Sequence, residues 1–283
     1  MDNLQPRIDS LPTLRETVEN HGLMAKKALG QNFLLDKNIT DKIIRLSLDK
    51  QKLTDFQGAE VFEVGPGPGG LTRSVLRNNP NKLTVVEMDE RCIDIMREIQ
   101  KLIGNRIEII NGDALKIDFS TLGQSPRHIV SNLPYNISVP LLTNWLWQIK
   151  SFNSLTLMFQ KEVADRICAP SGNKDYGRLS VLSQLICKID KLFDLNPNCF
   201  VPAPKIWSTV LLFQPLSEIP SQDILSKVEK LTSLAFGQRR KMIRQSLKSI
   251  PDLKSKLEAI GLSETLRAEQ ISPQQYLQLA NLI

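Results

Sequence analysis

The stretch NLPY, residues 132–135, follows an apolar run and joins an amide, a proline and an aromatic ring without any charge. The side-chain oxygen of Asn132 and the carbonyl oxygen of Leu133 are two hydrogen-bond acceptors, and Pro134 stiffens the turn that would aim them. Tyr135 offers a flat face on which a base can stack, worth ~1–3 kcal/mol. These groups, called the NLPY clamp below, suit the exocyclic amino group of a purine.

Methyl transfer to such an amine is the chemistry that the NLPY clamp predicts. The lone pair of the amine is delocalised into the ring, and two acceptors that hold its hydrogens favour a pyramidal nitrogen with the lone pair toward a methyl donor. No strong base is required, because the methylated nitrogen is cationic and water can remove its proton. Alignment and charge placement would carry the catalysis. Taken alone, the stretch is equally compatible with an ordinary asparagine turn beside a core tyrosine.

A glycine-rich turn and two acids follow three other apolar runs. Gly65, Gly67 and Gly70 satisfy the pattern G-x-G-x-x-G, in which glycines let the backbone turn sharply and approach a ligand. Glu87 ends the next run, 22 residues after Gly65, close to the spacing expected for a carboxylate that binds ribose hydroxyls. Asp113 follows the third run. Together they predict a nucleoside site.

The prolines within the glycine turn bear on the kind of cofactor. Pro66 and Pro68 each lack an N–H that could bind a pyrophosphate, so a nucleoside without phosphate fits better than a dinucleotide. S-adenosylmethionine is such a ligand. We expect Glu87 to bind its ribose, Asp113 its adenine amine, and the glycine turn its amino-acid tail.

The composition is that of an ordinary soluble globular protein, with 283 residues, 41% of them hydrophobic and 23% charged. No apolar stretch approaches the ~20 residues that span a bilayer, and four acids by residue 19 argue against a secretory signal. We therefore expect a cytosolic protein. No sequence feature determines the oligomeric state, and a monomer is taken as the simplest expectation. The four cysteines are scattered and the two histidines lie far apart, so no metal site is predicted. The net charge of +6 permits a polyanionic partner.

The elements that position these groups alternate along the chain. Apolar runs at 59–64, 82–88, 106–111 and 127–131 predict buried strands, with helices near 70–79 and 90–103. Further strands are predicted at 155–159, 188–195 and 206–213, with helices near 139–149, 161–168 and 177–186. This alternation predicts an α/β, Rossmann-like fold with a mostly parallel sheet. Near the N-terminus, Thr13 and Glu16 predict a capping box for a short helix.

The alternation ends around residues 213–223, and the rest of the chain has helical periodicity. We predict a domain boundary near residue 217, with a small all-helical C-terminal domain at 218–283.

The C-terminal part contains a basic segment, residues 239–248, that includes five cations and no acid: Arg239, Arg240, Lys241, Arg244 and Lys248. Those at 240, 244 and 248 recur every four residues and are predicted to form one stripe on a helix. A solvated basic face is the plain alternative, but the neighbouring base chemistry favours RNA phosphate contacts. Lys26, Lys27 and the loop 171–178 are secondary candidates for RNA contact.

Eight stretches, in order, resemble the motifs of the ribosomal RNA adenine dimethyltransferases. They are KKALGQNFLLD (26–36), EVGPGPGGLT (63–72), VEMD (86–89), GDAL (112–115), NLPYNIS (132–138), YGRLSVLSQ (176–184), FVPAPKIWSTV (200–210) and AFGQRRK (235–241). The resemblance runs from about residue 22 to the C-terminus. It implies an N-terminal extension at 1–21, a methyltransferase domain at 22–217 and a helical C-terminal domain at 218–283 that binds RNA or the ribosome. GQNFL together with NLPYNIS is highly specific, whereas the glycine turn alone is not.

The last two stretches are most similar to the bacterial small-subunit branch of this family. The resemblance implies dimethylation of N6 on two adjacent adenosines in the 3′-terminal hairpin of small-subunit (16S) rRNA, within an immature ribosomal subunit. It implies that six residues contact S-adenosylmethionine: Asn32, Leu34, Gly65, Glu87, Asp113 and Asn132. It also implies that Phe200 packs on the target base opposite Tyr135, in agreement with a slot for a flipped base.

Four other functions compete with this interpretation. The antibiotic-resistance branch modifies large-subunit rRNA with the same core, but the AFGQRRK stretch and long helical tail favour the small-subunit branch. A DNA adenine methyltransferase usually has an acid where Asn132 stands. A ribosome-assembly checkpoint, in which binding matters more than catalysis, can coexist with methylation. A nicotinamide-dependent dehydrogenase is a more remote possibility.

Overall fold

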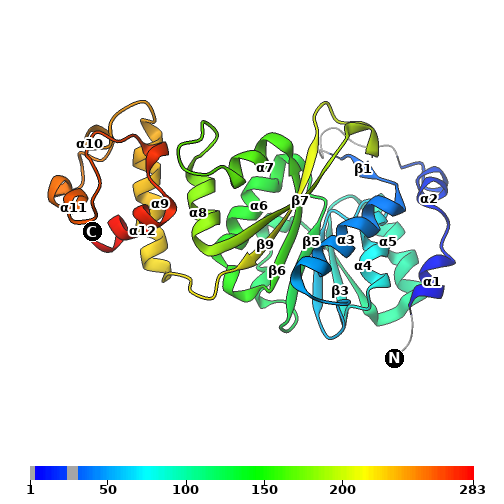
Figure 1. Ribbon diagram of the computed structural model, residues 1–283. Coiled ribbons are helices and arrows are strands. Elements are labelled where there is room, and N and C mark those ends of the chain that lie inside the picture. The colour runs from blue at the N-terminus through cyan, green and yellow to red at the C-terminus, as the bar shows by residue number, and fades with distance from the viewer. Residues whose placement is uncertain (1–3, 24–30) are drawn as a thin grey trace. The chain divides into compact units, whose positions relative to one another are not determined.

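The computed structural model describes residues 4–23 and 31–283 (Figure 1). The α-helices are α1 Gln5–Asp9, α2 Leu14–Asn20, α3 Lys37–Gln51, α4 Gly70–Arg77, α5 Glu90–Ile103, α6 Tyr135–Trp147, α7 Lys161–Cys168, α8 Arg178–Ile186, α9 Gln222–Gly237, α10 Ile243–Ser246, α11 Leu253–Ala259 and α12 Pro273–Asn281. The strands are β1 Phe33–Leu34, β2 Glu60–Val64, β3 Lys82–Glu87, β4 Ile107–Asn111, β5 Arg127–Ser131, β6 Ser154–Gln160, β7 Cys187–Leu195, β8 Phe200–Val201 and β9 Ser208–Pro215. Within the described ranges, each helix is too short or too polar to span a bilayer.

A seven-stranded sheet in the order β4-β3-β2-β5-β6-β9-β7 forms the centre of the fold. Each neighbouring pair from β4 to β6 is parallel, and β9 runs antiparallel to β6. The predicted strands and the mostly parallel sheet are confirmed. Because β2, β3, β4 and β5 are parallel, their carboxyl ends meet at one edge, where the glycine turn, the two acids and the NLPY clamp begin.

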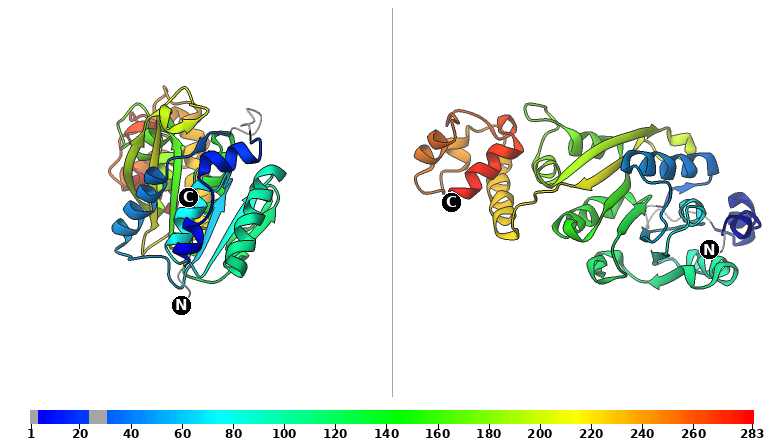
Figure 2. Two further views of the ribbon diagram at one scale, coloured as in Figure 1. Left: turned by 90° about the vertical axis from the view of Figure 1, so that its right-hand side faces the viewer. Right: turned by 60° about the horizontal axis from the view of Figure 1, so that its bottom comes forward.

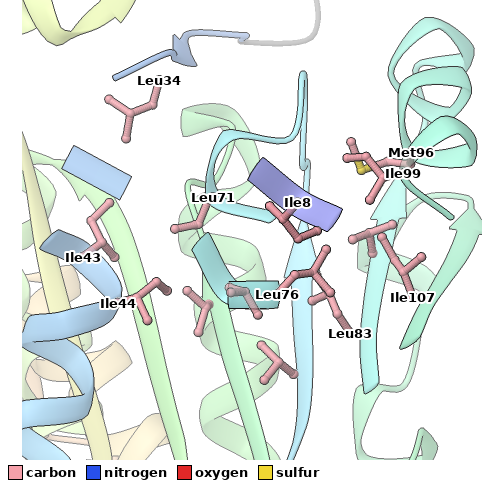
Figure 3. Close-up of a cluster of buried hydrophobic side chains, with 14 of the residues drawn as sticks. Ile8, Leu34, Ile43, Ile44, Leu71, Leu76, Leu83, Met96, Ile99 and Ile107 are labelled. Carbon is pink, nitrogen blue, oxygen red and sulfur yellow. The ribbon is translucent and has the colours of Figure 1, made fainter. Parts of the chain in front are cut away.

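Helices lie on both faces of the sheet (Figure 2). The burial of β2 on both faces illustrates this arrangement. Successive side chains of a strand point to opposite faces. Val61 belongs to a hydrophobic cluster with residues of α3, α4 and α5, which Figure 3 shows in part. Phe62 packs instead edge-on against Phe119, whose ring contacts Trp145 of α6. Both residues are fully buried, so the strand has no solvated face and reads as a continuous apolar run.

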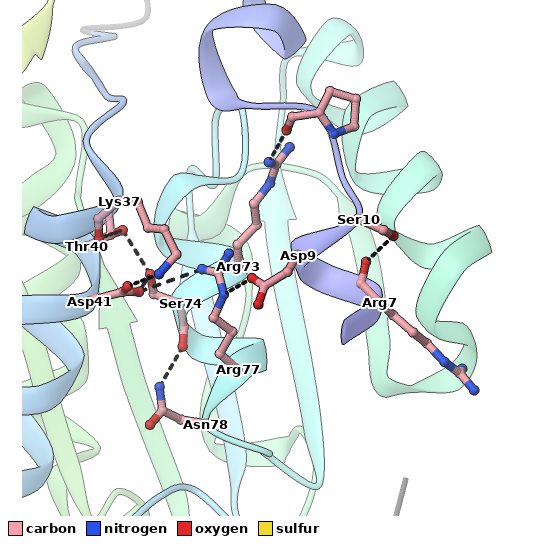
Figure 4. A network of polar contacts seen from close by, with 11 residues as sticks. Arg7, Asp9, Ser10, Lys37, Thr40, Asp41, Arg73, Ser74, Arg77 and Asn78 are labelled. Atoms are coloured by element: carbon pink, nitrogen blue, oxygen red, sulfur yellow. Dashed lines mark hydrogen bonds and ion pairs between the residues drawn. The ribbon is translucent and has the colours of Figure 1, made fainter. Parts of the chain in front are cut away.

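The N-terminal segment packs on this core. The predicted capping box is confirmed, since Glu16 accepts the backbone N–H of Thr13 while the Thr13 hydroxyl accepts that of Glu16. Ile8 is 1% exposed and lies in the hydrophobic cluster (Figure 3). Arg73 of α4 donates to the Pro12 carbonyl at 2.5 Å, and Arg77 pairs with Asp9 at 2.9 Å (Figure 4). The segment therefore braces the helix that follows the glycine turn.

Two compact units divide the chain. The first contains residues 1–161 and 190–213, and the second contains 162–189 and 214–283. In the second unit, the ring of Phe236 on α9 lies between Tyr176 and Tyr276, with centroids 6.0 and 6.2 Å away. Both phenol groups donate to backbone carbonyls, so these buried hydroxyls are satisfied. The predicted division into an N-terminal extension, a methyltransferase domain and a helical C-terminal domain concerns the roles of these segments and remains a prediction.

The predicted helix through the basic segment is wrong. Only Ile243–Ser246 is helical, while residues 240 and 248 lie in turns on either side. The reason is a set of long-range backbone bonds: the N–H of Ile243 donates to the Leu266 carbonyl, and Met242 forms a bridge with Arg267. The cations at 240, 244 and 248 therefore do not form one helical stripe. Two apolar residues of this part of the chain, Ile243 and Leu247, are fully buried.

Candidate functional site

A pocket opens at the carboxyl edge of the parallel strands. Its lining comes from β1, the glycine turn, the ends of β2 and β3, the loop after β4 and the NLPY clamp. It includes all six residues that are predicted to contact the cofactor: Asn32, Leu34, Gly65, Glu87, Asp113 and Asn132. All four residues of the NLPY clamp also line it. The fold thus gathers at one site residues that lie up to 103 positions apart in sequence.

The glycine turn owes its shape to positions that tolerate no side chain. Gly65 has a φ of +69°, and a Cβ there would lie 3.3 Å from the ring of Pro134. A Cβ on Gly70 would lie 2.6 Å from the carbonyl oxygen of Leu34. The turn is therefore in close contact with both the NLPY clamp and β1, and glycine is required for this approach.

Glu87 is a buried carboxyl group with a fixed orientation. One of its oxygens accepts the backbone N–H groups of Met88 and Asp89, at 2.8 and 2.9 Å. Burial raises its pKa, and these backbone donors oppose the shift. Met88 and Leu115 both line the pocket and are exposed, so two apolar side chains flank the predicted nucleoside site. Asp113 accepts the N–H of Leu115 at 3.0 Å and thereby caps the short 3₁₀ helix Ala114–Lys116.

One hydrogen bond sets the orientation of the Asn132 amide in the NLPY clamp. The side-chain amide of Asn132 donates through Nδ2 to the carbonyl oxygen of Asn32, at 3.3 Å. This bond uses one of the two N–H groups of the amide and sets its orientation, and the side-chain oxygen is left as an acceptor for a ligand. The hydroxyl of Ser131 donates to the Val64 carbonyl at 2.6 Å and ties the ends of β5 and β2 together.

Tyr135 begins α6, four residues earlier than the predicted helix. Pro134 serves as the N-cap residue, where its missing N–H is not needed. The Tyr135 hydroxyl lies 2.6 Å from the hydroxyl of Ser208, the fully buried first residue of β9. Burial raises the pKa of Tyr135, and the bond to Ser208 opposes this. The ring is therefore anchored at its far end while it lines the pocket.

Phe200 lies apart from the pocket wall. It is 3% exposed, belongs to the hydrophobic cluster and pairs with Leu34 in the two-stranded ladder of β1 and β8. The contact between Phe200 and a target base, which the family resemblance implies, remains a prediction. Lys26 and Lys27 lie outside the described residues.

The sequence interpretation missed Glu63, the last residue but one of β2, which lines the pocket. It is 1% exposed and accepts the hydroxyl of Thr72 at 2.7 Å. Burial raises its pKa to about 8, against the effect of the Thr72 bond. The available signal was an acid within the apolar run VFEV, because a charge at a fully buried strand position requires a specific partner.

The five cations of the basic segment fall into two groups in the second unit. Arg239 pairs with Glu269 at 2.6 Å and also bonds the Lys174 carbonyl. Arg244 pairs with Glu264 at 3.2 Å. The remaining three are exposed and have no ion pair within the described part of the chain: Arg240, Lys241 and Lys248.

The sequence comparisons identify the family of this pocket. A family profile described as "Ribosomal RNA adenine dimethylase" matches residues 22–283. The chain belongs to the ribosomal RNA adenine dimethylase family. It is therefore an RNA adenine methyltransferase, as the NLPY clamp predicts.

Relatives of the same family extend the match over nearly the whole chain. A Xanthobacter autotrophicus protein named ribosomal RNA small subunit methyltransferase A is 49% identical over 280 residues, or 97% of this chain and 94% of the relative. A Rhodospirillum rubrum protein of the same name is 45% identical, covering 97% and 93% of the two chains.

Solved structures of methyltransferases share the fold of this chain. A dimethyladenosine transferase from Plasmodium falciparum superposes with a TM-score of 0.73 at 26% identity, covering 86% of this chain and 94% of that one. The 23S rRNA methyltransferase ErmE superposes with a TM-score of 0.67 at 24% identity, covering 88% and 98% of the two chains, which supports the fold alone. The predicted Rossmann-like methyltransferase fold is confirmed.

Proposed function

We propose that this dimethylase transfers methyl groups from S-adenosylmethionine to N6 of two adjacent adenosines in the 3′-terminal hairpin of small-subunit (16S) rRNA. The observation that carries the proposal is the orientation of Asn132, whose Nδ2 donates to the Asn32 carbonyl. An acceptor fixed beside the glycine turn matches an amino group that must be held toward a methyl donor. The names of the relatives, at 45–49% identity over 97% of this chain, support the small subunit as the substrate.

The pocket fits S-adenosylmethionine on two structural grounds. The buried carboxyl of Glu87, oriented by two backbone N–H groups, can accept two ribose hydroxyls. The close approaches at Gly65 and Gly70 leave backbone, rather than side chains, to contact an amino-acid tail. When bound, the cofactor supplies an activated methyl group on a sulfonium. Asp113, Asn32 and Leu34 complete the wall that would hold the nucleoside.

The chain's own residues act by orientation. Asn132 Oδ1 and the Leu133 carbonyl accept the two hydrogens of the adenine amino group, so that its lone pair points to the methyl donor. Tyr135, held by Ser208, stacks on the base and fixes its plane. Because these acceptors are preorganised and their pocket is lined largely by buried residues, they stabilise the developing positive charge on nitrogen without reorganisation. Water removes the proton after transfer.

RNA binding by the second unit is assigned to its exposed cations. Arg240 and Lys248, together with Lys241, are available for phosphates. Arg239 and Arg244 contribute mainly by holding the basic segment in place through Glu269 and Glu264. Phosphate contacts of this kind position the protein on RNA, and base contacts at the pocket would supply selectivity.

The test is labelled-methyl transfer from S-adenosylmethionine to immature small subunits, naked 16S rRNA, large subunits and DNA in parallel, followed by nucleoside analysis. The proposal predicts N6,N6-dimethyladenosine in the small-subunit samples alone. Label in large subunits would identify the resistance-type activity instead. If the Asn132→Ala protein promoted subunit maturation as well as the unaltered protein, binding rather than catalysis would be the main function.

A further inference from the structure

Residues 201–207, which comprise the last residue of β8 and the loop to β9, form an unusually apolar exposed segment. Val201, Ile206 and Trp207 are 52%, 40% and 47% exposed. Large apolar side chains that gather in one exposed stretch are typical of interaction sites. Met88 and Leu115, which line the pocket, are exposed in the same way.

The sheet register places Trp207 at the same edge as the pocket. Ser208 pairs with Gln160, the last residue of β6, and β9 runs antiparallel to β6. The start of β9 therefore lies at the carboxyl edge of the parallel strands, where the NLPY clamp also lies. The backbone holds Trp207 there, because its carbonyl accepts the N–H of Lys161 at 2.8 Å.

A direct contact links this loop to the substrate side of the pocket. Ser208, the next residue after Trp207, makes the 2.6 Å hydroxyl contact with Tyr135. The Tyr135 ring, which is proposed to stack on the target base, is therefore hydrogen-bonded to the residue that directly follows Trp207. The Trp207 indole itself is exposed. The indole makes no ring contact or hydrogen bond within the described residues.

The composition of the loop fits RNA better than a protein partner. Lys205 is exposed and has no ion pair among the residues that the structure describes. An exposed aromatic ring two positions from an exposed cation is a combination that suits single-stranded nucleic acid, because every base has a face to stack and every nucleotide a phosphate. Pro202 and Pro204 each fix one backbone dihedral, which reduces the ordering cost of binding.

We propose that Trp207 stacks on an unpaired nucleotide next to the target adenosine, while Lys205 contacts its phosphate. This inference rests on the proposed function. It adds a second base-binding position outside the pocket, whose role is to hold the flanking nucleotide while the target base occupies the NLPY clamp. Stacking of this kind is sequence-tolerant, so it strengthens RNA binding without selecting a base.

The experiment compares Trp207→Ala, Trp207→Phe and the control Leu53→Ala, which removes a 39% exposed apolar side chain elsewhere. Steady-state methylation is measured with immature small subunits and with the isolated 3′-terminal RNA hairpin. We expect Trp207→Ala to raise KM for both RNA substrates about tenfold, with kcat and KM for S-adenosylmethionine within about twofold. Trp207→Phe should recover most of the loss, and Leu53→Ala should match the unaltered protein.

The outcomes separate this inference from the proposed function. An unaltered protein that fails to methylate small-subunit RNA contradicts the proposed function itself. An active protein whose KM is unchanged by Trp207→Ala overturns the stacking role. A rise in KM for whole subunits with none for the hairpin would also overturn it, because it would indicate a ribosomal protein as the partner. Quenching of tryptophan fluorescence by the hairpin should disappear in Trp207→Phe, and persistent quenching would count against the inference.

Discussion

The NLPY clamp and the basic segment are both proposed to present polar groups to RNA, but they would use them in opposite ways. In the NLPY clamp no residue is charged, and the amide of Asn132 is fixed by one hydrogen bond within a pocket. In the basic segment, the cations that are fixed by ion pairs are Arg239 and Arg244, whereas Arg240 and Lys248 are exposed and without such pairs in the described chain.

This difference follows from what each region must do. Methyl transfer needs acceptors at a defined distance from one nitrogen, so orientation has to be set before the substrate arrives. Phosphate binding acts through long-range charge attraction and tolerates mobile side chains. Single substitutions in the NLPY clamp should therefore have large effects on turnover, and those in the basic segment should have small, salt-dependent effects on affinity.

The largest effect is expected for Asn132→Ala. Loss of one preorganised transition-state partner typically lowers turnover by ~10²–10³-fold. We expect a loss of this size in single-turnover methylation, measured with saturating cofactor and small-subunit RNA. Asn105→Ala, at an exposed site in the 3₁₀ helix Gly104–Arg106, is the matched control. A turnover within tenfold of normal would mean that Asn132 is not the acceptor.

A smaller effect is expected for Gly65→Ala, which links the glycine turn to the NLPY clamp. The new Cβ would have to be accommodated at a φ of +69° and 3.3 Å from Pro134, at a cost of about 1–3 kcal/mol. We expect turnover to fall roughly tenfold or more, with weaker cofactor binding in calorimetry. Gly237→Ala, where no atom lies within 4 Å of the added Cβ, is the control. Equal activity of the two variants would show that the Pro134 contact is unimportant.

In the basic segment, the double variant Arg240→Glu with Lys248→Glu should weaken RNA binding without changing cofactor affinity. Losing two phosphate contacts should also reduce the slope of log K against log salt by about 1–2. Lys254→Glu, an exposed charge reversal on α11, is the control. Binding that is unchanged at every salt concentration would identify the exposed cations as a solvated surface.

The smallest effect concerns stability rather than activity, and involves Glu63. Burial raises the pKa of Glu63 in the folded state from 4.5 to about 8. Protonation of Glu63 therefore contributes fully to the free energy of unfolding below pH 4.5, and this contribution is lost as the pH rises through about 8. Glu63→Gln remains neutral and should escape this loss. We expect the fall in Tm between pH 5 and pH 9 to be smaller in Glu63→Gln than in the unaltered protein by several degrees, at about 2–4 °C per kcal/mol.

The control for this measurement is Glu218→Gln, at an exposed position. It should retain the pH dependence of the unaltered protein. The same fall in Tm for Glu63→Gln and Glu218→Gln would show that Glu63 titrates near its usual value.

The sequence predicted the active edge of the sheet well because the information there is local. Each strand is a continuous apolar run, and the glycine turn, Glu87 and the NLPY clamp each follow directly from a strand end. Parallel pairing then brings these ends together without further information. The start of α6 was missed because a proline at the N-cap allows the helix to begin at Tyr135.

Long-range contacts explain what could not be predicted. The basic segment has helical periodicity, but bonds to Leu266 and Arg267, more than 20 residues later, draw it out of a helix. The pairing of Arg73 with the Pro12 carbonyl and Thr17 joins segments about 60 residues apart, and no local pattern marks it. The acceptor role of Glu63 depends in the same way on Thr72 from the next helix.

The most direct test of the central claim is a crystal structure of the protein with a non-reactive S-adenosylmethionine analogue and adenosine monophosphate. We expect the adenine N6 atom to lie about 3 Å from both Asn132 Oδ1 and the Leu133 carbonyl oxygen, facing the transferable position of the analogue. An adenine amino group turned away from these two oxygens, or an Asn132 amide that presents its NH₂ to the base, would contradict the account.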